Sequence, residues 1–246
     1  MNASAHPHNE QINRTNLDFW QQESTVDTYG EDSLQIPEAV ILIRHREEIA
    51  GRRIFDLGCG TGRTTTVLCQ LSPHYTGLDY SQTMLDRCHQ RFPDLPFHCC
   101  DVRHMDHFAS ASFDFILFSY NGLDYVDHDG RMAALGHIHR LLVPGGLFVF
   151  SSHNRTSIAE DTGPRLKLAR GLRAVAFELK DFVRSSINHL RRRSLQVRTD
   201  EYAILNDEGA EYSMLTYYIA PDQQAAQLER NGFEFLEMYD LDGRQL

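Results

Sequence analysis

Three glycines lie within five residues of one another, directly after a short apolar run. They are Gly58, Gly60 and Gly62 in the segment IFDLGCGTGR, residues 54–63. Glycines in the first strand-to-helix turn of an α/β sheet let the backbone turn tightly and approach a ligand closely. The spacing GxGxG differs from the GxGxxG of dinucleotide-binding proteins and so disfavours a nicotinamide cofactor. We expect a ligand-binding loop here, in which Asp56 either orients the loop or a ligand amine, or is purely structural.

Proton transfer would need a base, and His153 is the main candidate. It follows the apolar run GGLFVFSS and is expected at the sheet edge that carries the glycine loop, although a hydrogen-bonded loop histidine is the alternative. His137 and His139 are two residues apart on an expected helix and therefore face different directions. Residues 99–107, CCDVRHMDH, bring cysteine, aspartate and histidine together, but no separated partner pair completes a zinc site, so no metal is expected.

Short apolar runs alternate with amphipathic helices through the middle of the chain. The expected strands lie within residues 52–57, 75–79, 96–101, 113–119 and 145–153, and the expected helices within residues 63–71, 81–92 and 130–142. Ser81 is the expected N-cap of the second helix. This alternation predicts an α/β fold, a doubly wound, Rossmann-like and mostly parallel sheet with helices on both faces.

The flanking segments depart from this alternation. After a polar tail, residues 19–32 look irregular and lid-like, and Pro37 begins a helix that runs to Ile49. Residues 155–193 read as a long basic helical stretch, and residues 198–220 as two strands joined by the turn NDEG. A helix and a final strand, FEFLEMYDL, end the chain.

These segments predict one domain built from four parts. We expect an N-terminal lid and helix in residues 1–50, a ligand-binding core in residues 51–154, a helical and hairpin insertion that covers the substrate in residues 155–220, and a helix and strand in residues 221–246 that complete the core. A chain of 246 residues is long enough for one such domain and short for two.

Charge is distributed unevenly along the chain. The net charge is −10, yet residues 155–198 hold eleven basic and four acidic residues, a net +7, so the remainder carries −17. An acidic body disfavours nucleic acid as a partner. No apolar run approaches the length of a membrane span, and the start of the chain lacks the pattern of a secretory signal, so we expect no membrane partner and a cytoplasmic location. The five cysteines, odd in number and without CxxC spacing, suit reduced thiols.

The run DLGCGTG has the form (D/E)xGxGxG, and with it residues 54–150 resemble the class I S-adenosylmethionine (SAM) dependent methyltransferases. Support also comes, at the proper spacing, from YTGLDYS, CCDVRHM, FSYNGLDYV and LLVPGGLFVFSS. The resemblance implies SAM as the cofactor. It implies cofactor contacts from the loop residues Asp56, Gly58, Cys59, Gly60 and Gly62, and from Asp79, Tyr80, Asp101, Val102 and Ser119.

Individual roles follow from that resemblance. Asp79 stands where the family's acidic residue accepts from both ribose hydroxyls, with helix capping as the alternative. Tyr80 would lie near the adenosine, and Asp101 and Val102 would read the adenine amino edge. Ser119, Tyr120 and Asn121 end the fourth strand beside the reacting centre, and Tyr29 belongs to a segment that closes over the methionine portion in many relatives.

The end of the chain departs from the family pattern. Class I enzymes usually end on a strand hairpin whose seventh strand runs antiparallel, but this chain stops soon after FEFLEMYDLDG. Either the last strand is missing or another strand takes its place. The insertion, residues 155–220, has no counterpart that identifies the substrate, and the oligomeric state is open.

Three functions are compatible with these residues. The first is SAM-dependent methyl transfer to a small molecule, in which the protein mainly aligns the nucleophile with the methyl group. The second is a cyclising enzyme in which the SAM amine attacks its own γ-carbon, giving methylthioadenosine and azetidine-2-carboxylate. Tyr29, Tyr120, Asn121 and Tyr125 would supply aromatic and polar walls to either pocket. The third is a SAM-binding protein without chemistry.

Overall fold

The computed structural model describes residues 7–28, 33–158, 163–166 and 171–246. The chain divides into two compact units. The parallel-sheet unit comprises Trp20–Leu123, Gly130–Ser151 and Ala225–Leu246, and the mixed-sheet unit comprises Met1–Phe19, Asp124–Asp129 and Ser152–Gln224. These units cross the boundaries expected from the sequence, because the N-terminal helix groups with the insertion.

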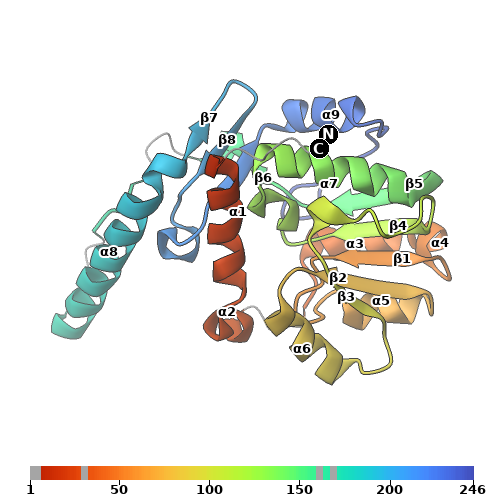
Figure 1. Cartoon of the computed structure of the whole chain (residues 1–246), viewed down its shortest axis with the longest axis horizontal. Helices are drawn as coiled ribbons and strands as arrows, with labels where there is room; N and C mark the ends of the chain where they lie inside the picture. The colour runs from red at the N-terminus through yellow and green to blue at the C-terminus, as the bar shows by residue number, and fades with distance from the viewer. Residues whose placement is uncertain (1–6, 29–32, 159–162, 167–170) are drawn as a thin grey trace. The chain divides into compact units, whose positions relative to one another are not determined.

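Five parallel strands form the sheet of the parallel-sheet unit (Figure 1). They are β1 (Ile54–Leu57), β2 (Tyr75–Asp79), β3 (Phe97–Cys99), β4 (Phe113–Phe118) and β5 (Leu142–Phe150), in the order β3-β2-β1-β4-β5. The chain moves outward from β1 to one edge and then returns to β4 on the other side. The strand order therefore reverses between β1 and β4, which is where ligands bind in open α/β sheets.

Helices cover both faces of this sheet. They are α2 (Glu23–Thr28), α3 (Ile36–Arg44), α4 (Arg46–Ile49), α5 (Thr65–Leu71), α6 (Gln82–Arg91), α7 (His128–Leu141) and α9 (Pro221–Arg230), of which α7 and α9 begin within residues of the other unit. Successive strand residues point to opposite faces, so Phe55 packs with α7 and α9 while Ile54 packs with α3, α4 and α5. The predicted Rossmann-like α/β fold is confirmed.

A second sheet, of four strands, forms the mixed-sheet unit. Its order is β6-β9-β8-β7, in which β6 (His153–Asn154) runs parallel to β9 (Thr216–Ile219), and β8 (Tyr202–Leu205) runs antiparallel to both β9 and β7 (Val197–Arg198). The expected hairpin of residues 198–220 is thus present as β8 and β9. Helix α8 (Leu172–Arg192) precedes the hairpin, but it begins well after the expected start at residue 155, and the described residues 163–166 are not helical.

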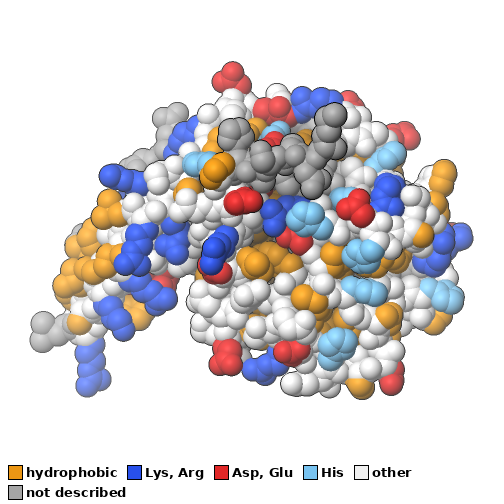
Figure 2. Space-filling view, viewed as in Figure 1, with side chains coloured by type: hydrophobic (Ala, Val, Ile, Leu, Met, Phe, Trp, Pro, Cys, Tyr) orange, Lys and Arg blue, Asp and Glu red, His pale blue; other side chains and the backbone are white. Residues whose placement is uncertain are grey.

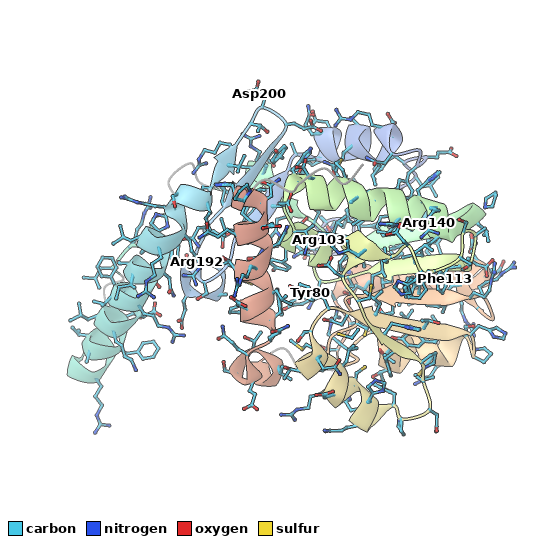
Figure 3. All side chains as sticks on the ribbon, in the orientation of Figure 1. Tyr80, Arg103, Phe113, Arg140, Arg192 and Asp200 are labelled. Carbon is cyan, nitrogen blue, oxygen red and sulfur yellow. The ribbon has the colours of Figure 1, made fainter. Side chains whose placement is uncertain are left out.

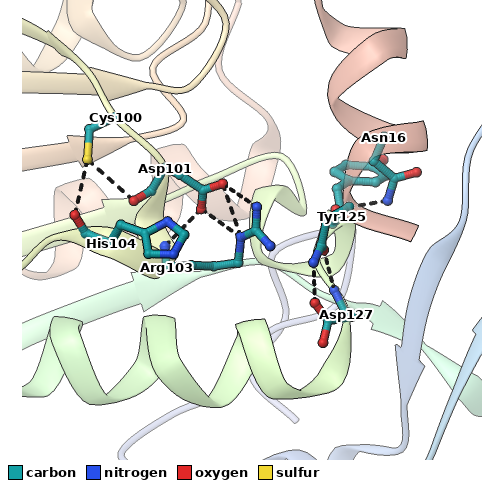
Figure 4. A network of polar contacts seen from close by, with 8 residues as sticks. Asn16, Cys100, Asp101, Arg103, His104, Tyr125 and Asp127 are labelled. Atoms are coloured by element: carbon teal, nitrogen blue, oxygen red, sulfur yellow. Dashed lines mark hydrogen bonds and ion pairs between the residues drawn. The ribbon is translucent and has the colours of Figure 1, made fainter. Parts of the chain in front are cut away.

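The N-terminal region is more ordered than its polar composition suggested. Helix α1 (Pro7–Trp20) buries Ile12 in the core of the second sheet. Asn16, fully buried on the same helix, donates to the carbonyls of Tyr125 and Leu215 at 2.8 Å and accepts from the Leu215 amide at 2.9 Å (Figure 4). Backbone groups of distant segments therefore stabilise a helix where a polar tail was expected.

Four other expectations about the elements are wrong. Residues 19–28 are largely helical rather than irregular, and the helix expected from Pro37 to Ile49 is split into α3 and α4 at His45. Strand β5 ends at Phe150, so His153 belongs to β6 of the other sheet. The final strand is absent from the described residues, where residues 233–241 form only an isolated bridge between Tyr239 and Gln245. Leu236, within this segment, is exposed.

Candidate functional site

The glycine loop follows β1 at the point where the strand order reverses. Gly58, Gly60 and Gly62 all have positive φ, at 61°, 56° and 90°. A Cβ on Gly62 would lie 2.6 Å from the Phe92 ring, whereas a Cβ on Gly60 would meet nothing within 4 Å. Both backbone conformations favour glycine, but Gly62 is also required by packing, while Gly60 borders open space in which a ligand can lie against the backbone.

Packing also fixes the two glycines next to the end of β4. A Cβ on Gly58 would lie 2.8 Å from the Phe118 ring, and a Cβ on Gly122 would lie 2.1 Å from it. The Phe118 ring therefore occupies the space between the loop after β1 and the loop after β4. This arrangement holds the two loops in one place at the carboxyl end of the sheet.

Asp56 is the last acidic residue before the loop and is fully enclosed. Its Oδ2 accepts from the Thr64 hydroxyl at 2.7 Å and from the Tyr75 hydroxyl at 2.9 Å. Burial raises the pKa of Asp56 to about 6, and these hydrogen bonds oppose the rise. Its Oδ1 and the hydroxyl of Thr61 are buried and have no hydrogen-bond partner among the residues that the structure describes. Two unsatisfied polar atoms thus border the glycine loop, where a polar ligand would satisfy them.

Asp79 ends β2 and connects the loop to the neighbouring helix. Its Oδ2 accepts from the Gly60 amide at 2.9 Å, and its Oδ1 accepts from the Ser81 amide at 2.8 Å. Burial raises its pKa to about 6, and the backbone hydrogen bonds lower it in part. Each carboxylate oxygen can accept a further hydrogen bond, so the group can orient the loop and still receive two ligand hydroxyls. Ser81 accepts from the Met84 amide, which confirms the predicted N-cap of α6.

Asp101 is held by its own neighbour. Arg103 donates to both carboxylate oxygens, with its Nε 2.9 and 3.0 Å away and its Nη2 2.6 Å from Oδ2 (Figure 4). Burial alone would raise the pKa of Asp101, but the guanidinium outweighs burial and holds the pKa below its ordinary value. The adjacent Val102 is buried in the core, so only its backbone can face a ligand. The Arg103 contact had no signal in the sequence beyond its spacing of two residues.

Ser119 belongs to a buried polar cluster that sequence reasoning missed. Arg63 forms a two-pronged ion pair with Glu38, at 2.6 and 2.7 Å, and donates to the Ser119 hydroxyl at 3.1 Å. The Ser119 hydroxyl also donates to Glu38. Burial opposes ionisation of Glu38, but Arg63 and Ser119 lower its pKa below the ordinary value. The only local signal was an acidic residue in the first turn after Pro37.

The loop after β4 has an unusual backbone. Tyr120 and Asn121 are consecutive left-handed residues, with φ of 54° and 59°. The Asn121 amide donates to the Ser151 hydroxyl at 2.7 Å, and the Arg63 guanidinium lies 5.1 Å from the centre of the exposed Tyr120 ring. Such conformations in residues other than glycine are strained and concentrate at functional sites.

Two residues predicted to contact the cofactor, Cys59 and Tyr80, differ in how deeply their side chains are buried. The Cys59 side chain is buried with Leu85 and Cys88, and the contact with Cys88 together with burial raises the pKa of its thiol well above the ordinary value. Only the backbone of Cys59 can therefore serve a ligand at the loop. Tyr80 is half-buried directly after β2 (Figure 3).

His153 lies in the mixed-sheet unit and forms a dyad with Asp124. Its Nδ1 lies 2.8 Å from the Asp124 Oδ2, which also accepts from the His153 amide at 2.6 Å, and the Ser152 hydroxyl donates to Oδ1 at 2.8 Å. The Asp124 side chain is 0 % exposed and that of His153 is 28 % exposed. A buried carboxylate on Nδ1 selects the tautomer whose Nε2 accepts a proton. The sequence named His153 but gave no sign of Asp124.

Aromatic side chains surround this dyad. The rings of Tyr125 and Tyr218 have centres 6.2 and 5.2 Å from that of His153. Tyr218 donates to Asp207, and burial followed by that carboxylate raises the pKa of the phenol. The mixed-sheet unit therefore places the His153 imidazole beside two aromatic rings. Tyr29, the remaining predicted site residue, lies outside the described residues.

The described part of the chain offers neither a metal cluster nor a membrane-spanning helix. No group of three or more histidine, cysteine, aspartate or glutamate side chains is arranged to hold a metal ion there. Among the described helices, none is both long and apolar enough to span a membrane.

Comparison with known proteins identifies similarities to methyltransferases. Residues 54–146 match the family model described as "Methyltransferase domain". The chain is 33 % identical over 119 residues to the ubiquinone biosynthesis O-methyltransferase of Nitrosococcus oceani, covering 46 % of this chain and 49 % of that protein. It is also 33 % identical over 111 residues to a trans-aconitate 2-methyltransferase of Acidovorax sp., covering 44 % of this chain and 41 % of that protein.

The fold comparison extends over more of the chain. The structure is similar, with a TM-score of 0.60, to the 1,6-didemethyltoxoflavin-N1-methyltransferase of Burkholderia thailandensis, crystallised with 1,6-didemethyltoxoflavin and S-adenosylhomocysteine. The match covers 95 % of this chain and 83 % of that chain. Because the two sequences are only 16 % identical, the match shows a shared fold and nothing about function. The chain spans about half or less of the length of the curated relatives named above.

Proposed function

We propose that this chain, a member of the class I SAM-dependent methyltransferases, transfers the SAM methyl group to a small molecule. One observation carries the proposal. At the reversal of the parallel sheet, a loop of left-handed glycines contains Gly60, beside which a Cβ would meet no described atom within 4 Å. The loop also borders two buried polar atoms, Asp56 Oδ1 and Thr61 Oγ1, that have no partner among the described residues. A ligand with a cationic amine and several hydroxyls, as SAM is, fits these groups.

Each part of the SAM molecule is proposed to contact different residues of the loop and of the strand ends. The backbone of residues 58–62 approaches the methionine portion, Asp56 receives its amine directly or through water, and Asp79 receives the ribose hydroxyls. Bound SAM supplies an activated methyl group on a sulfonium, so little covalent help is needed from the protein. Tyr80 packs near the adenosine.

Asp101 reads the adenine amino group in this proposal, but it must share its carboxylate with Arg103. Both oxygens already accept from that guanidinium. A carboxylate offers about four acceptor positions, so the adenine amine can bind without loss of the ion pair. The backbone amide of Val102 supplies the second contact to the base.

Residues after β4 position the reacting centre. Ser119 is fixed by Glu38 and Arg63, and the left-handed pair Tyr120 and Asn121 is fixed by Ser151. We propose that Tyr120 offers its ring to the sulfonium and that the Asn121 amide orients the methyl acceptor. We propose that Tyr29 closes over the methionine portion of SAM.

His153 removes a proton from the acceptor in this proposal. Asp124 orients the imidazole through Nδ1, and Tyr125 and Tyr218 supply aromatic surface. Such a base serves a hydroxyl or amine acceptor, because a carboxylate is ionised already at neutral pH. The insertion, residues 155–220, is proposed to determine which acceptor is methylated.

The acceptor is proposed to be a small molecule. The relatives named above act in ubiquinone biosynthesis, on trans-aconitate and on 1,6-didemethyltoxoflavin. The acidic body of this chain disfavours polyanions. A cytoplasmic location remains a prediction from the sequence.

The test uses SAM with a deuterated methyl group and no guessed substrate. The purified protein is incubated with this SAM, alone and with a fraction of cellular metabolites, and the products are followed by mass spectrometry. Methyl transfer predicts S-adenosylhomocysteine and a labelled metabolite only when the fraction is present. Methylthioadenosine with azetidine-2-carboxylate from SAM alone would instead establish the cyclising enzyme. Bound, unconsumed SAM under both conditions would favour a SAM-binding protein without chemistry.

A further inference from the structure

Helix α8 exposes a continuous apolar stripe. Its members are Val175, Leu179, Val183, Ile187 and Leu190, which are 48, 51, 48, 45 and 59 % exposed. Spacings of four and three residues place them on one face of the helix. Most other large apolar side chains that are exposed, such as Ile43 and Leu241, are not part of such a row, so the stripe is the feature that needs an explanation.

The opposite face of α8 holds the helix to its own unit. Ser185 is buried, the Asn188 amide group donates to the Glu211 carbonyl at 2.9 Å, and the His189 Nδ1 lies 3.0 Å from the Asn206 Oδ1. At 3.6 residues per turn, Ser185 and Asn188 lie roughly half a turn from the centre of the stripe, and His189 lies about a quarter turn from it. The apolar stripe therefore points away from the rest of the mixed-sheet unit.

A row of basic residues lies along one edge of the stripe. Arg173, Lys180, Arg184 and Arg191 are all exposed and lie about a quarter turn from its centre. Arg184 also pairs with Glu211 at 2.8 Å, with both side chains largely open to solvent. Figure 2 shows apolar and basic side chains together over this helix. The helix thus presents an apolar face and a positive edge, in a chain whose net charge is −10.

We infer that α8 docks on the surface of an anionic lipid bilayer. A helix with an apolar stripe and flanking Lys and Arg side chains lies in the plane of the interface, where its apolar side chains enter the acyl boundary. The long basic side chains reach the anionic headgroups. This inference concerns attachment to a surface and goes beyond the proposed methyl transfer.

A second copy of the chain fits this face less well. If two α8 helices packed antiparallel through their apolar stripes, the basic edges of both would lie on the same side of the pair. Like charges would then face one another along the whole contact, which is unfavourable. An anionic bilayer instead presents negative charge under every basic side chain of the row.

The test is sedimentation of the full chain with lipid vesicles. Vesicles of phosphatidylcholine and phosphatidylglycerol in equal parts should bind the protein, and vesicles of phosphatidylcholine alone should not. The double variant Leu179→Asp/Val183→Asp should weaken binding by more than about tenfold, since each change removes an exposed apolar side chain that would be buried in the bilayer. Replacing Lys180 by Gln should weaken it about fivefold, and added salt should act in the same direction.

The matched control is Ile43→Asp, which changes an exposed apolar residue of the parallel-sheet unit and should leave vesicle binding unchanged. Circular dichroism and SAM binding of each variant report that it is folded. Failure of the unmodified chain to bind anionic vesicles, equal binding to both vesicle types, or full binding by the double variant would each overturn the inference. Self-association in sedimentation equilibrium that the double variant abolishes would overturn it in favour of a second copy.

Discussion

The two sheets of this chain are assembled from different lengths of sequence. The parallel sheet is formed by strands β1 to β5 in residues 54–150, each connected to the next by a single segment. The second sheet is formed by residues 153–219, and its unit needs α1 from the start of the chain and residues 124–129 from the middle. The first is largely local in the sequence, and the second depends on contacts between distant segments.

This difference decides where the candidate groups lie. Asp56, Asp79, Asp101 and Ser119 each come at or just after the end of a parallel strand, so one edge of the sheet collects them. His153 gains its role only from Asp124, which lies 29 residues earlier. The positions of the proposed cofactor-binding residues therefore follow from strand order, whereas the position of the proposed base depends on tertiary packing.

The largest expected effect concerns the mixed-sheet unit and is on catalysis. Replacing His153 by Gln should lower kcat for a methylated acceptor by about a hundredfold or more, because a positioned base contributes that much to a proton-coupled step. SAM affinity should stay as it is. Asp124→Asn should reproduce part of the loss by removing the carboxylate that orients the imidazole. Unchanged turnover in both variants would leave the dyad as a structural contact.

The next effect is on the free energy of unfolding and concerns the long-range hydrogen bonds of the mixed-sheet unit. Asn16→Ala should lower the free energy of unfolding by about 3 kcal/mol, since it leaves the buried backbone groups of Tyr125 and Leu215 unpaired. Thermal and denaturant unfolding measure the loss. Thr15→Ala, on the exposed side of the same helix, is the control and should change stability by less than about 0.5 kcal/mol. Equal effects from the two changes would contradict the hydrogen bonds described for Asn16.

Two glycines of one loop should respond differently. Gly62→Ala should cost about 3 kcal/mol of stability, because the new Cβ would meet Phe92 in addition to the left-handed backbone. Gly60→Ala should cost about 1 kcal/mol of stability, since its Cβ enters open space, but should weaken SAM binding. Calorimetry and unfolding of the same pair of proteins give both quantities. If Gly60→Ala bound SAM normally, the open space beside it would not be the ligand site.

The sequence predicted the parallel sheet well for a physical reason. Apolar strands and amphipathic helices in strict alternation specify a parallel sheet. The glycines and aspartates at the carboxyl ends of its strands indicate the edge at which a ligand is expected. The cluster of Glu38, Arg63 and Ser119 could not be anticipated, because an ion pair between residues 25 positions apart leaves no periodic pattern.

Predictions failed where tertiary contacts override local composition. The polar N-terminal stretch is helical because Asn16 and Ile12 are buried against residues of the second sheet. The segment FEFLEMYDL alternates like a strand but forms no ladder in the described residues. His153 lies in β6, a two-residue strand that is recognised by its pairing with β9. The sequence of the insertion likewise contains no local motif from which a substrate could be predicted.

The smallest effect is a dependence on pH in the parallel-sheet unit. Burial raises the pKa of Asp56 and of Asp79 to about 6, above their ordinary 3.8, so the folded state takes up protons that the unfolded state releases. Stability without ligand should therefore rise by about 2 to 3 kcal/mol as the pH falls from 7 to 5, about half from each carboxylate. The lowered pKa values of Glu38 and Asp101 oppose this only at more acidic pH.

Binding of SAM should show the opposite trend. Both carboxylates serve the cationic, hydroxyl-rich ligand best when ionised, so SAM affinity should fall as the pH passes below about 6. Thermal unfolding at pH 7 and pH 5, with and without SAM, measures both trends. Asp79→Asn is the control, because it removes one of the two titrating groups and should halve the change. A flat profile would mean that neither group titrates in this range.

The most direct test of the central claim is SAM binding by isothermal titration calorimetry to the unmodified chain and to Asp79→Ala. If the glycine loop and Asp79 hold the cofactor, the unmodified chain should bind one SAM, and the variant should bind about thirtyfold more weakly, because hydrogen bonds to a charged carboxylate contribute about 2 kcal/mol. Absence of SAM binding by the unmodified chain, or equal affinity of the two folded proteins, would contradict the cofactor site described for the parallel sheet.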